Sequence, residues 1–260
     1  MRIGIIGAGA YGRAIGGILK ENGHEIQYYD PAITSSQIDA TTKFGEVLVI
    51  AVPSAVILDV LCEIPKDKPL IIATKGILGD KIFADFNDVM VLSGPGFADD
   101  IKLGKKIGLT ITDIRIRDLM GTKYVDYDYT TDRNGVLLCG SLKNVYAILA
   151  GFEGLVRGEV EWKRFISETL DEMREVLMSN GADPETVGLF CGKGDLELTA
   201  GLPSRNYEFG LNLRRDKTAK PSKTVEGWSA LRKIMNGELI IPKKAEKMNF
   251  LVELRSENGS

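Results

Sequence analysis

The first thirty residues contain a short apolar strand pattern that runs directly into a glycine-rich turn. Residues 2–6 are rich in isoleucine, residues 7–12 carry the spacing GxGxxG, and residues 14–19 continue with helical apolar spacing. In such a unit the first glycine permits the turn, the second lets a pyrophosphate approach the backbone, and the third lets the helix pack against the strand. The helix N-terminus then faces the phosphates. The turn residues expected at a dinucleotide are Gly7, Gly9, Ala10, Tyr11 and Gly12.

An acidic residue follows the second predicted strand. Residues 25–29 predict that strand, and Asp30 comes directly after it. A carboxylate at this place accepts hydrogen bonds from a ribose 2′-hydroxyl and repels a 2′-phosphate. The expected cofactor is therefore NAD (NADH) rather than NADP. The alternative interpretation is a glycine-rich turn in an α/β protein that binds no nucleotide.

Further apolar segments continue the sheet pattern. They predict strands at residues 47–52, 69–73, 89–92, 109–112 and 123–128. Three of these strands end in Pro, Gly, Ser or Lys, as expected where ligands lie beyond the carboxyl ends of parallel strands. Near Asn134 the pattern becomes helical. The predicted fold class is α/β, with an NAD-binding Rossmann domain (parallel sheet) at residues 1–130 and an all-helical substrate and catalytic domain at residues 131–260.

Composition limits the partners. The net charge of -3 gives no reason to expect nucleic acid or an anionic membrane surface. No uninterrupted apolar run reaches the roughly 18 residues that span a bilayer, so no membrane insertion is expected, and the N-terminus lacks the pattern of a cleavable signal. The three cysteines are far apart in the sequence, which suits a reducing cytoplasm. No metal site is expected.

A single histidine restricts the chemistry. His24 lies in the turn before the second predicted strand, at the sheet edge opposite the glycine turn. Histidine-based dehydrogenation, a Ser-His-Asp triad and the usual zinc sites therefore lack their key residue. A reductase built on this chain needs another proton donor. Lys143 is a candidate, because its neighbours on the predicted helix at residues 136–150 are small or apolar. A lysine whose ammonium extends to solvent is the equal alternative.

A second unusual stretch spans residues 192–210. Asp195 follows two glycines, and Arg205 and Asn206 offer a group of donors suited to a phosphate or carboxylate. A helix-capping aspartate and a surface arginine are the alternative reading of the same residues.

Taken in order, these motifs resemble the NAD(P)-dependent glycerol-3-phosphate dehydrogenases. The resemblance extends over most of the chain to about residue 230 and implies reduction of dihydroxyacetone phosphate to sn-glycerol 3-phosphate. It also implies a Rossmann domain and a helical domain with the substrate between them. The segments that carry it are residues 7–12, 51–54, 74–77, 92–98, 142–145, 181–186, 194–196, 204–206 and 225–227.

The resemblance implies a role for each matching residue. Lys143 would be the general acid/base, Asp195 its partner and Lys75 a second catalytic lysine. The implied substrate-binding residues are Lys75, Asn144, Thr199, Arg205 and Asn206, with Arg205 and Asn206 on the phosphate. Beyond the glycine turn and Asp30, the implied cofactor-binding residues are Pro53, Lys75, Ala98, Arg205 and Glu226.

Some positions depart from the family pattern. Gly96 stands where the family usually has serine in its SGPxFA motif, and the chain is shorter than typical members. Two other classes of function stay open on the residues alone. One is another lysine-dependent NAD(P) reductase acting on a different small oxo-acid or hydroxy-acid. The other is a catalytically silent NAD-binding protein. A homodimer is compatible with the sequence.

Overall fold

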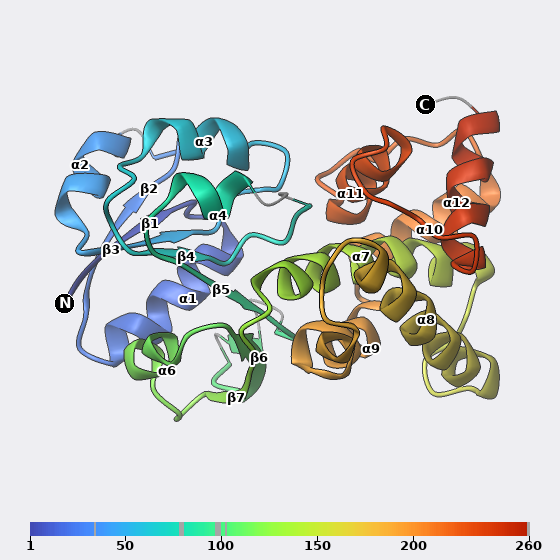
Figure 1. Ribbon diagram of the computed structural model, residues 1–260, viewed down its shortest axis with the longest axis horizontal. Coiled ribbons are helices and arrows are strands. Elements are labelled where there is room, and N and C mark those ends of the chain that lie inside the picture. The colour runs from blue at the N-terminus through green and yellow to red at the C-terminus, as the bar shows by residue number, and fades with distance from the viewer. Residues whose placement is uncertain (34, 78–80, 97–99, 102, 259–260) are drawn as a thin grey trace. The chain divides into compact units, whose positions relative to one another are not determined.

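The chain divides into two compact units, Met1–Arg133 (unit 1) and Asn134–Ser260 (unit 2). A computed structural model describes residues 1–33, 35–77, 81–96, 100–101 and 103–258. Unit 1 holds a sheet covered by helices, whereas unit 2 consists of helices (Figure 1). The chain thus has a Rossmann domain followed by an all-helical domain, as the sequence predicts.

Unit 1 is built on a seven-stranded sheet in the order β2-β1-β3-β4-β5-β6-β7. Most of its strands are buried apolar segments, as expected for a sheet covered on both faces. Figure 1 shows α3 and α4 on one face and α1 and α6 on the other. The strands are β1 (Arg2–Ile6), β2 (Glu25–Tyr29), β3 (Val47–Ile50), β4 (Leu70–Ile72), β5 (Val89–Ser93), β6 (Ile107–Ile111) and β7 (Val125–Tyr129). The helices are α1 (Ala10–Glu21), α2 (Ile38–Phe44), α3 (Ile57–Glu63), α4 (Lys81–Asp85) and α6 (Ile114–Met120).

One strand pair departs from the predicted parallel sheet. β6 runs antiparallel to β5, with Leu92 opposite Ile111 and Ser93 opposite Thr110, whereas the other neighbouring strands are parallel. Apolar runs mark strands but carry no information about their direction. At this junction the backbones lie close together. A Cβ on Gly94 would lie only 2.3 Å from the carbonyl oxygen of Gly108.

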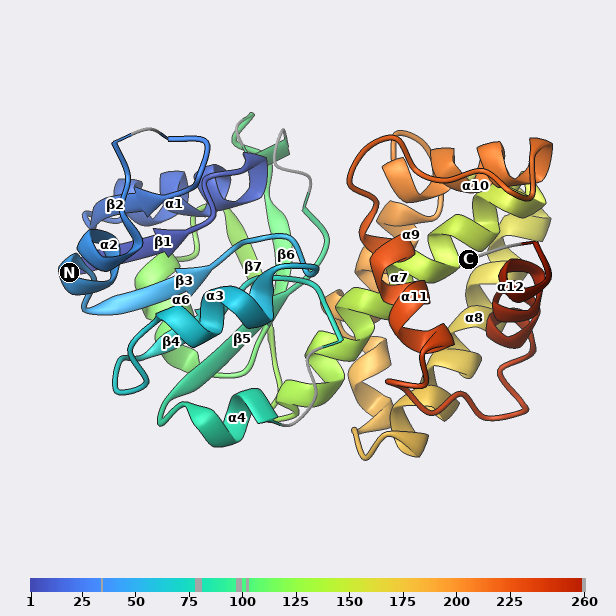
Figure 2. The ribbon, with the colours of Figure 1, turned by 90° about the horizontal axis from the view of Figure 1, so that it is seen from above.

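Unit 2 is arranged around its first helix, α7. Figure 2 shows α8, α10 and α11 gathered around it. The α-helices are α7 (Arg133–Glu153), α8 (Val160–Ser179), α9 (Asp195–Thr199), α10 (Arg205–Arg215), α11 (Glu226–Met235) and α12 (Glu246–Glu257). Two short turns, η1 (Pro184–Gly188) and η2 (Phe190–Gly194), connect α8 to α9.

α7 is the core helix of unit 2. By length and composition it could cross a membrane, with a mean hydropathy of 1.5, but 94% of that apolar stretch is buried inside the protein. The helix has no long uninterrupted apolar run, because Gly, Ser, Asn and Lys are interleaved with its apolar residues. Burial on all sides explains this composition, since a helix enclosed by other helices needs no polar face.

Two glycines let α7 and α10 touch backbone to backbone. A Cβ on Gly151 of α7 would lie 2.0 Å from the carbonyl oxygen of Tyr207, and a Cβ on Gly210 of α10 would lie 1.9 Å from that of Ile148. No side chain fits at either position without moving a helix. The two helices are therefore held at a fixed separation by their own backbones.

A buried carboxylate joins α7, α8 and α12. Glu172 of α8 accepts hydrogen bonds from the Tyr146 hydroxyl at 3.1 Å and from the backbone N–H groups of Lys247 and Met248 at 2.8 and 3.3 Å. Ala245, which precedes α12, provides no side-chain cap. Glu172 therefore supplies the capping acceptor from another helix. Burial raises the pKa of Glu172, while the two N–H groups and the hydroxyl favour its ionised form.

We expect Glu172→Ala to lower the free energy of unfolding of unit 2 by about 1–3 kcal/mol, because it leaves buried donors unsatisfied. Both tryptophans, Trp162 and Trp228, lie in unit 2, so urea unfolding followed by tryptophan fluorescence reports on this unit. The control is Asp171→Ala, which removes an exposed carboxylate one residue earlier and should change the free energy by less than about 1 kcal/mol. Equal effects of the two substitutions would contradict the capping role.

Candidate active site

The glycine turn of unit 1 has the geometry of a phosphate cradle. Gly7 has a φ of 104°, and a Cβ there would lie 2.6 Å from the carbonyl oxygen of Ala51. A Cβ on Gly12 would lie 2.0 Å from the carbonyl oxygen of Gly7, so this position also requires glycine. Nothing lies within 4 Å of a Cβ placed on Gly9, so the backbone there is open to a ligand. Gly7 and Gly12 therefore shape the turn, and Gly9 leaves space beside it.

The start of α1 and the end of β2 complete this cradle. α1 begins at Ala10 with no side-chain cap and no acidic residue in its first turn, so its N-terminus suits an anion. Asp30 accepts hydrogen bonds from the backbone N–H groups of Ala8 at 2.8 Å and Ala32 at 2.9 Å. A carboxylate has about four acceptor sites, so these two bonds leave acceptor capacity for a ribose. The residues present fit a dinucleotide with its ribose at Asp30.

The other cofactor-site predictions in unit 1 lie at the carboxyl ends of strands. Pro53 is exposed just beyond β3. Lys75 is partly buried beyond β4, where its Nζ donates to the carbonyl oxygen of Gly94 at 3.2 Å and lies 5.9 Å from the centre of the Tyr11 ring. Lys75 therefore lies beside the glycine turn. Ala98 falls outside the described residues.

In unit 2, Lys143 is buried together with two acceptors from α9. Its Nζ donates to Asp195 Oδ1 at 2.9 Å and to Thr199 Oγ1 at 2.7 Å, and the exposed fractions of the Lys143 and Asp195 side chains are 6% and 2%. Asp195 and Thr199 are one helical turn apart, which places both on the same face of α9. The ammonium thus ends inside the unit rather than at the solvent, and the expected pairing with Asp195 is present.

A chain of two amides begins at Asn144, the residue after Lys143 on α7. Asn144 Oδ1 accepts from Asn206 Nδ2 at 2.8 Å, and Asn206 Oδ1 accepts from the backbone N–H of Gly227 at 2.9 Å. This links α7, α10 and α11. A Cβ on Gly227 would lie 2.4 Å from the carbonyl oxygen of Asn144, so Gly227 makes the link sterically feasible. The sequence marks Gly227 only as the residue after Glu226, and its packing role was not predicted.

Arg205 and Glu226 are the first residues of α10 and α11, the helices tied together by these amides. Arg205 is exposed, and Ser204 caps its helix by accepting from the Tyr207 N–H. Glu226 is partly buried. The structure therefore brings Lys143, Asp195 and Thr199 into direct contact, and it joins Asn144 and Asn206 in the amide chain. Arg205 and Glu226 each precede a residue of that chain in the sequence.

His24 contacts other residues of unit 1. Its Nε2 is 3.0 Å from the carbonyl oxygen of Leu119, and its Nδ1 is 3.4 Å from the N-terminal amine. His24 lies in the turn between α1 and β2, as the sequence predicts, and both of its ring nitrogens are close to polar groups of the protein.

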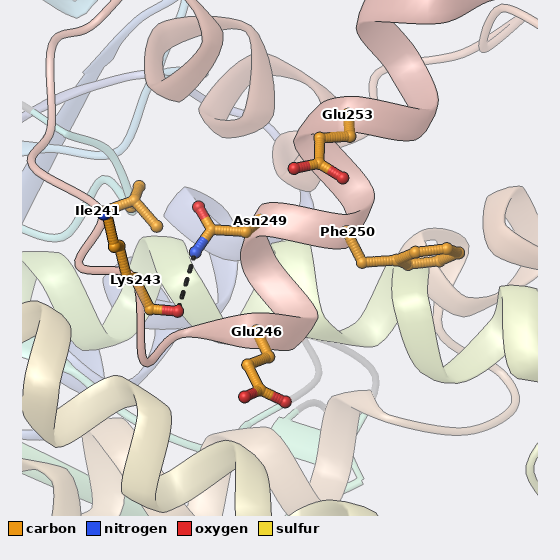
Figure 3. Close-up of a pocket in the computed structure, with 6 residues that line it drawn as sticks. All are labelled: Ile241, Lys243, Glu246, Asn249, Phe250 and Glu253. Carbon is orange, nitrogen blue, oxygen red and sulfur yellow. Dashed lines mark hydrogen bonds between the residues drawn. The ribbon is translucent and has the colours of Figure 1, made fainter.

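A surface hollow of about 420 Å³ lies beside α12 (Figure 3). None of the predicted site residues lines it. The side-chain amide of Asn249 in this hollow donates to the carbonyl oxygens of Pro242 and Lys243 at 3.0 and 3.4 Å, which holds the loop before α12. The lining of the hollow consists of Ile241, Lys243, Glu246, Asn249, Phe250 and Glu253.

A glycine cradle on a Rossmann sheet and a buried lysine–aspartate pair in a helical unit define a nicotinamide-dependent oxidoreductase. The family model for the C-terminus of NAD-dependent glycerol-3-phosphate dehydrogenase matches residues 132–253. A glycerol-3-phosphate dehydrogenase (NAD(P)+) of Pseudomonas entomophila is 32% identical, in a match that covers 80% of this chain and 74% of the relative. The chain belongs to the NAD(P)-dependent glycerol-3-phosphate dehydrogenase family, as the resemblance of its motifs indicates.

Solved structures of the family share the fold. A glycerol-3-phosphate dehydrogenase from Coxiella burnetii is similar with a TM-score of 0.78 and 22% identity, covering 97% of this chain and 94% of that one. One from Plasmodium falciparum has a TM-score of 0.80 and 18% identity, covering 100% of this chain and 92% of that one. At such identities the likeness supports the two-domain fold.

Proposed function

We propose that this chain reversibly reduces dihydroxyacetone phosphate to sn-glycerol 3-phosphate with NADH, using Lys143 as the general acid/base. Family membership supports the reaction. The observation that carries the assignment of the proton donor is the buried contact of Lys143 with Asp195 and Thr199. We also propose unit 1 as the NAD-binding domain and unit 2 as the substrate and catalytic domain.

The residues of unit 2 suit the proton transfer. NADH, when bound, supplies the hydride that reduces the carbonyl carbon. As negative charge develops on the substrate oxygen, the Lys143 ammonium stabilises it and donates a proton to it. Asp195 and Thr199 fix the direction of the ammonium, and the Asp195 carboxylate favours its charged form. In the reverse direction neutral Lys143 takes the proton from the alcohol.

We assign the phosphate of the substrate to Arg205 and Asn206, and we assign Lys75 as a second cation at the substrate. A guanidinium binds a phosphate with two parallel hydrogen bonds, and the exposed position of Arg205 leaves it accessible to a ligand. Asn206 uses its Oδ1 and one N–H of its amide within the protein, and an amide nitrogen has two N–H donors. Asn144 and Glu226 complete the proposed substrate and cofactor contacts.

The test of the function is NADH oxidation, followed by absorbance, with dihydroxyacetone phosphate as substrate. We expect turnover with this compound and very little with unphosphorylated dihydroxyacetone, because the phosphate contributes binding energy remote from the reacting carbon. A small 2-oxo-acid serves as the comparison. Turnover of the oxo-acid alone would overturn the proposal in favour of a different reductase, and NADH binding without any turnover would favour a silent NAD-binding protein.

We expect Asp30→Asn to narrow the preference for NADH over NADPH by about tenfold or more in kcat/KM. The carboxylate repels a 2′-phosphate, and a charge–charge interaction near a protein surface is worth about 1–4 kcal/mol at contact distance. The asparagine side chain keeps one acceptor oxygen, so it retains one of the two hydrogen bonds that Asp30 accepts from the Ala8 and Ala32 N–H groups. The control is Asp39→Asn in α2. Equal kcat/KM for the two cofactors in the unaltered protein would contradict the role of Asp30.

The proposed substrate and the cysteine content also indicate a partner and a compartment for this protein. The partner is a small phosphorylated metabolite. We place the protein in the cytoplasm, since its three separated cysteines suit a reducing compartment. A homodimer stays a prediction.

A further inference from the structure

A single π-turn directs the chain into α9. In η2 the N–H of Asp195 donates to the carbonyl oxygen of Phe190, five residues earlier, and also to that of Gly192. Such turns are rare, and they often occur at functional sites. An α-helix advances by about 100° per residue, so an inserted residue changes the direction of every side chain that follows. This turn closes on Asp195 itself.

The turn requires glycine at position 192. A Cβ there would lie 2.2 Å from the carbonyl oxygen of Val187, 2.7 Å from its carbonyl carbon and 2.8 Å from its Cα. All three atoms belong to the backbone, so no side-chain rotation relieves the contact. Gly192 also donates its N–H to the carbonyl oxygen of Leu189 at 3.1 Å. Any larger residue at this position must displace η1 or η2.

A displacement of η2 reaches the proposed proton donor through α9. Asp195 and Thr199, the two acceptors of the Lys143 ammonium, are the first and last residues of this short helix. We propose that Gly192 is a positioning residue for the reaction, which acts by permitting the π-turn that points Asp195 at Lys143. This inference rests on the proposed function, because it assumes that Lys143 is the proton donor.

The first test is Gly192→Ala. We expect kcat with dihydroxyacetone phosphate to fall about 10²-fold, as misplacement of a catalytic group by about 1 Å does. The dissociation constant for NADH should be unchanged, because the glycine cradle lies in unit 1. The matched control is Gly188→Ala in η1, where nothing lies within 4 Å of the new Cβ and kcat should stay within about threefold. A normal kcat in Gly192→Ala would overturn the inference.

The second test asks whether the effect passes through Asp195. In the Asp195→Asn background we expect Gly192→Ala to cost less than about threefold in kcat, since residues that act through one another are not additive. The same loss in both backgrounds would mean that Gly192 only supports the fold, and would overturn the inference. If Gly192→Ala does not fold, Cys191→Ala replaces it. That change adds no atoms and removes the 3.7 Å contact by which Cys191 Sγ of η2 reaches the Thr186 carbonyl oxygen of η1. Its loss of kcat should likewise vanish in the Asp195→Asn background.

Failure of the proposed function is a separate outcome. It would appear as no turnover of dihydroxyacetone phosphate by the unaltered protein. The unaltered protein, Gly192→Ala, Asp195→Asn and the double variant can then be compared by their free energies of unfolding, a measurement that needs no substrate. A non-additive effect of Gly192→Ala and Asp195→Asn on stability would support the positioning of Asp195, and additive effects would contradict it.

Discussion

Lys143→Ala should reduce kcat by about 10²–10⁴-fold, the usual contribution of a general acid, together with some loss of alkoxide stabilisation. NADH affinity should be preserved, because the glycine cradle belongs to unit 1. The measurement is turnover of the folded variant beside its dissociation constant for NADH. The control is Lys163→Ala, which removes an exposed lysine of α8 and should leave both quantities unchanged.

Two further substitutions separate proton transfer from charge. Lys143→Arg should not restore activity, because a guanidinium keeps its proton and cannot act as both acid and base. Asp195→Asn should have a smaller effect than Lys143→Ala, since it disturbs the direction and charge of the lysine but retains the proton donor. Near-normal turnover of Lys143→Ala would make Lys75 the candidate acid instead.

Arg205→Ala should cost about 2–4 kcal/mol of transition-state binding with dihydroxyacetone phosphate, through loss of a charged hydrogen bond and poorer positioning of the carbonyl. Reduction of unphosphorylated dihydroxyacetone, although very slow, should be almost indifferent to the change. The quantity to measure is kcat/KM for both compounds. Arg215→Ala, which removes an exposed arginine from the last residue of α10, is the matched control. An equal loss with both compounds would mean that Arg205 supports the fold rather than the phosphate.

Much of unit 1 could be predicted because its strands are short apolar runs that end in turn residues. β2 spans the predicted residues 25–29, and the other six strands lie within about two residues of the predicted ranges. The direction of β6 could not be predicted, because strand direction depends on the path of the connection and not on the residues of the strand. α2 was not predicted either, since its seven residues form too short a segment to show a clear helical period.

Some residues of the candidate site could be predicted from the sequence, but most of their contacts could not. Lys143 stood out because a lone cation among small and apolar residues is unusual, but its acceptors come from more than fifty residues away, and only the resemblance to a family related them. The amide chain from Asn144 through Asn206 to Gly227 has no local signature. Neither does the buried contact of Tyr146 with Glu172, in which two polar residues on separate helices satisfy each other. Such pairings arise from tertiary packing, which one-dimensional patterns do not encode.

The backbone contact between α7 and α10 has a consequence for the length of the substrate. Lys143 lies on α7 and Arg205 begins α10, and Gly151 and Gly210 keep these helices too close to shift. On the proposed function, the distance between the proton donor and the residue that binds the phosphate is therefore fixed. A substrate with an additional carbon between its carbonyl and its phosphate cannot reach both residues at once, however well either end binds alone.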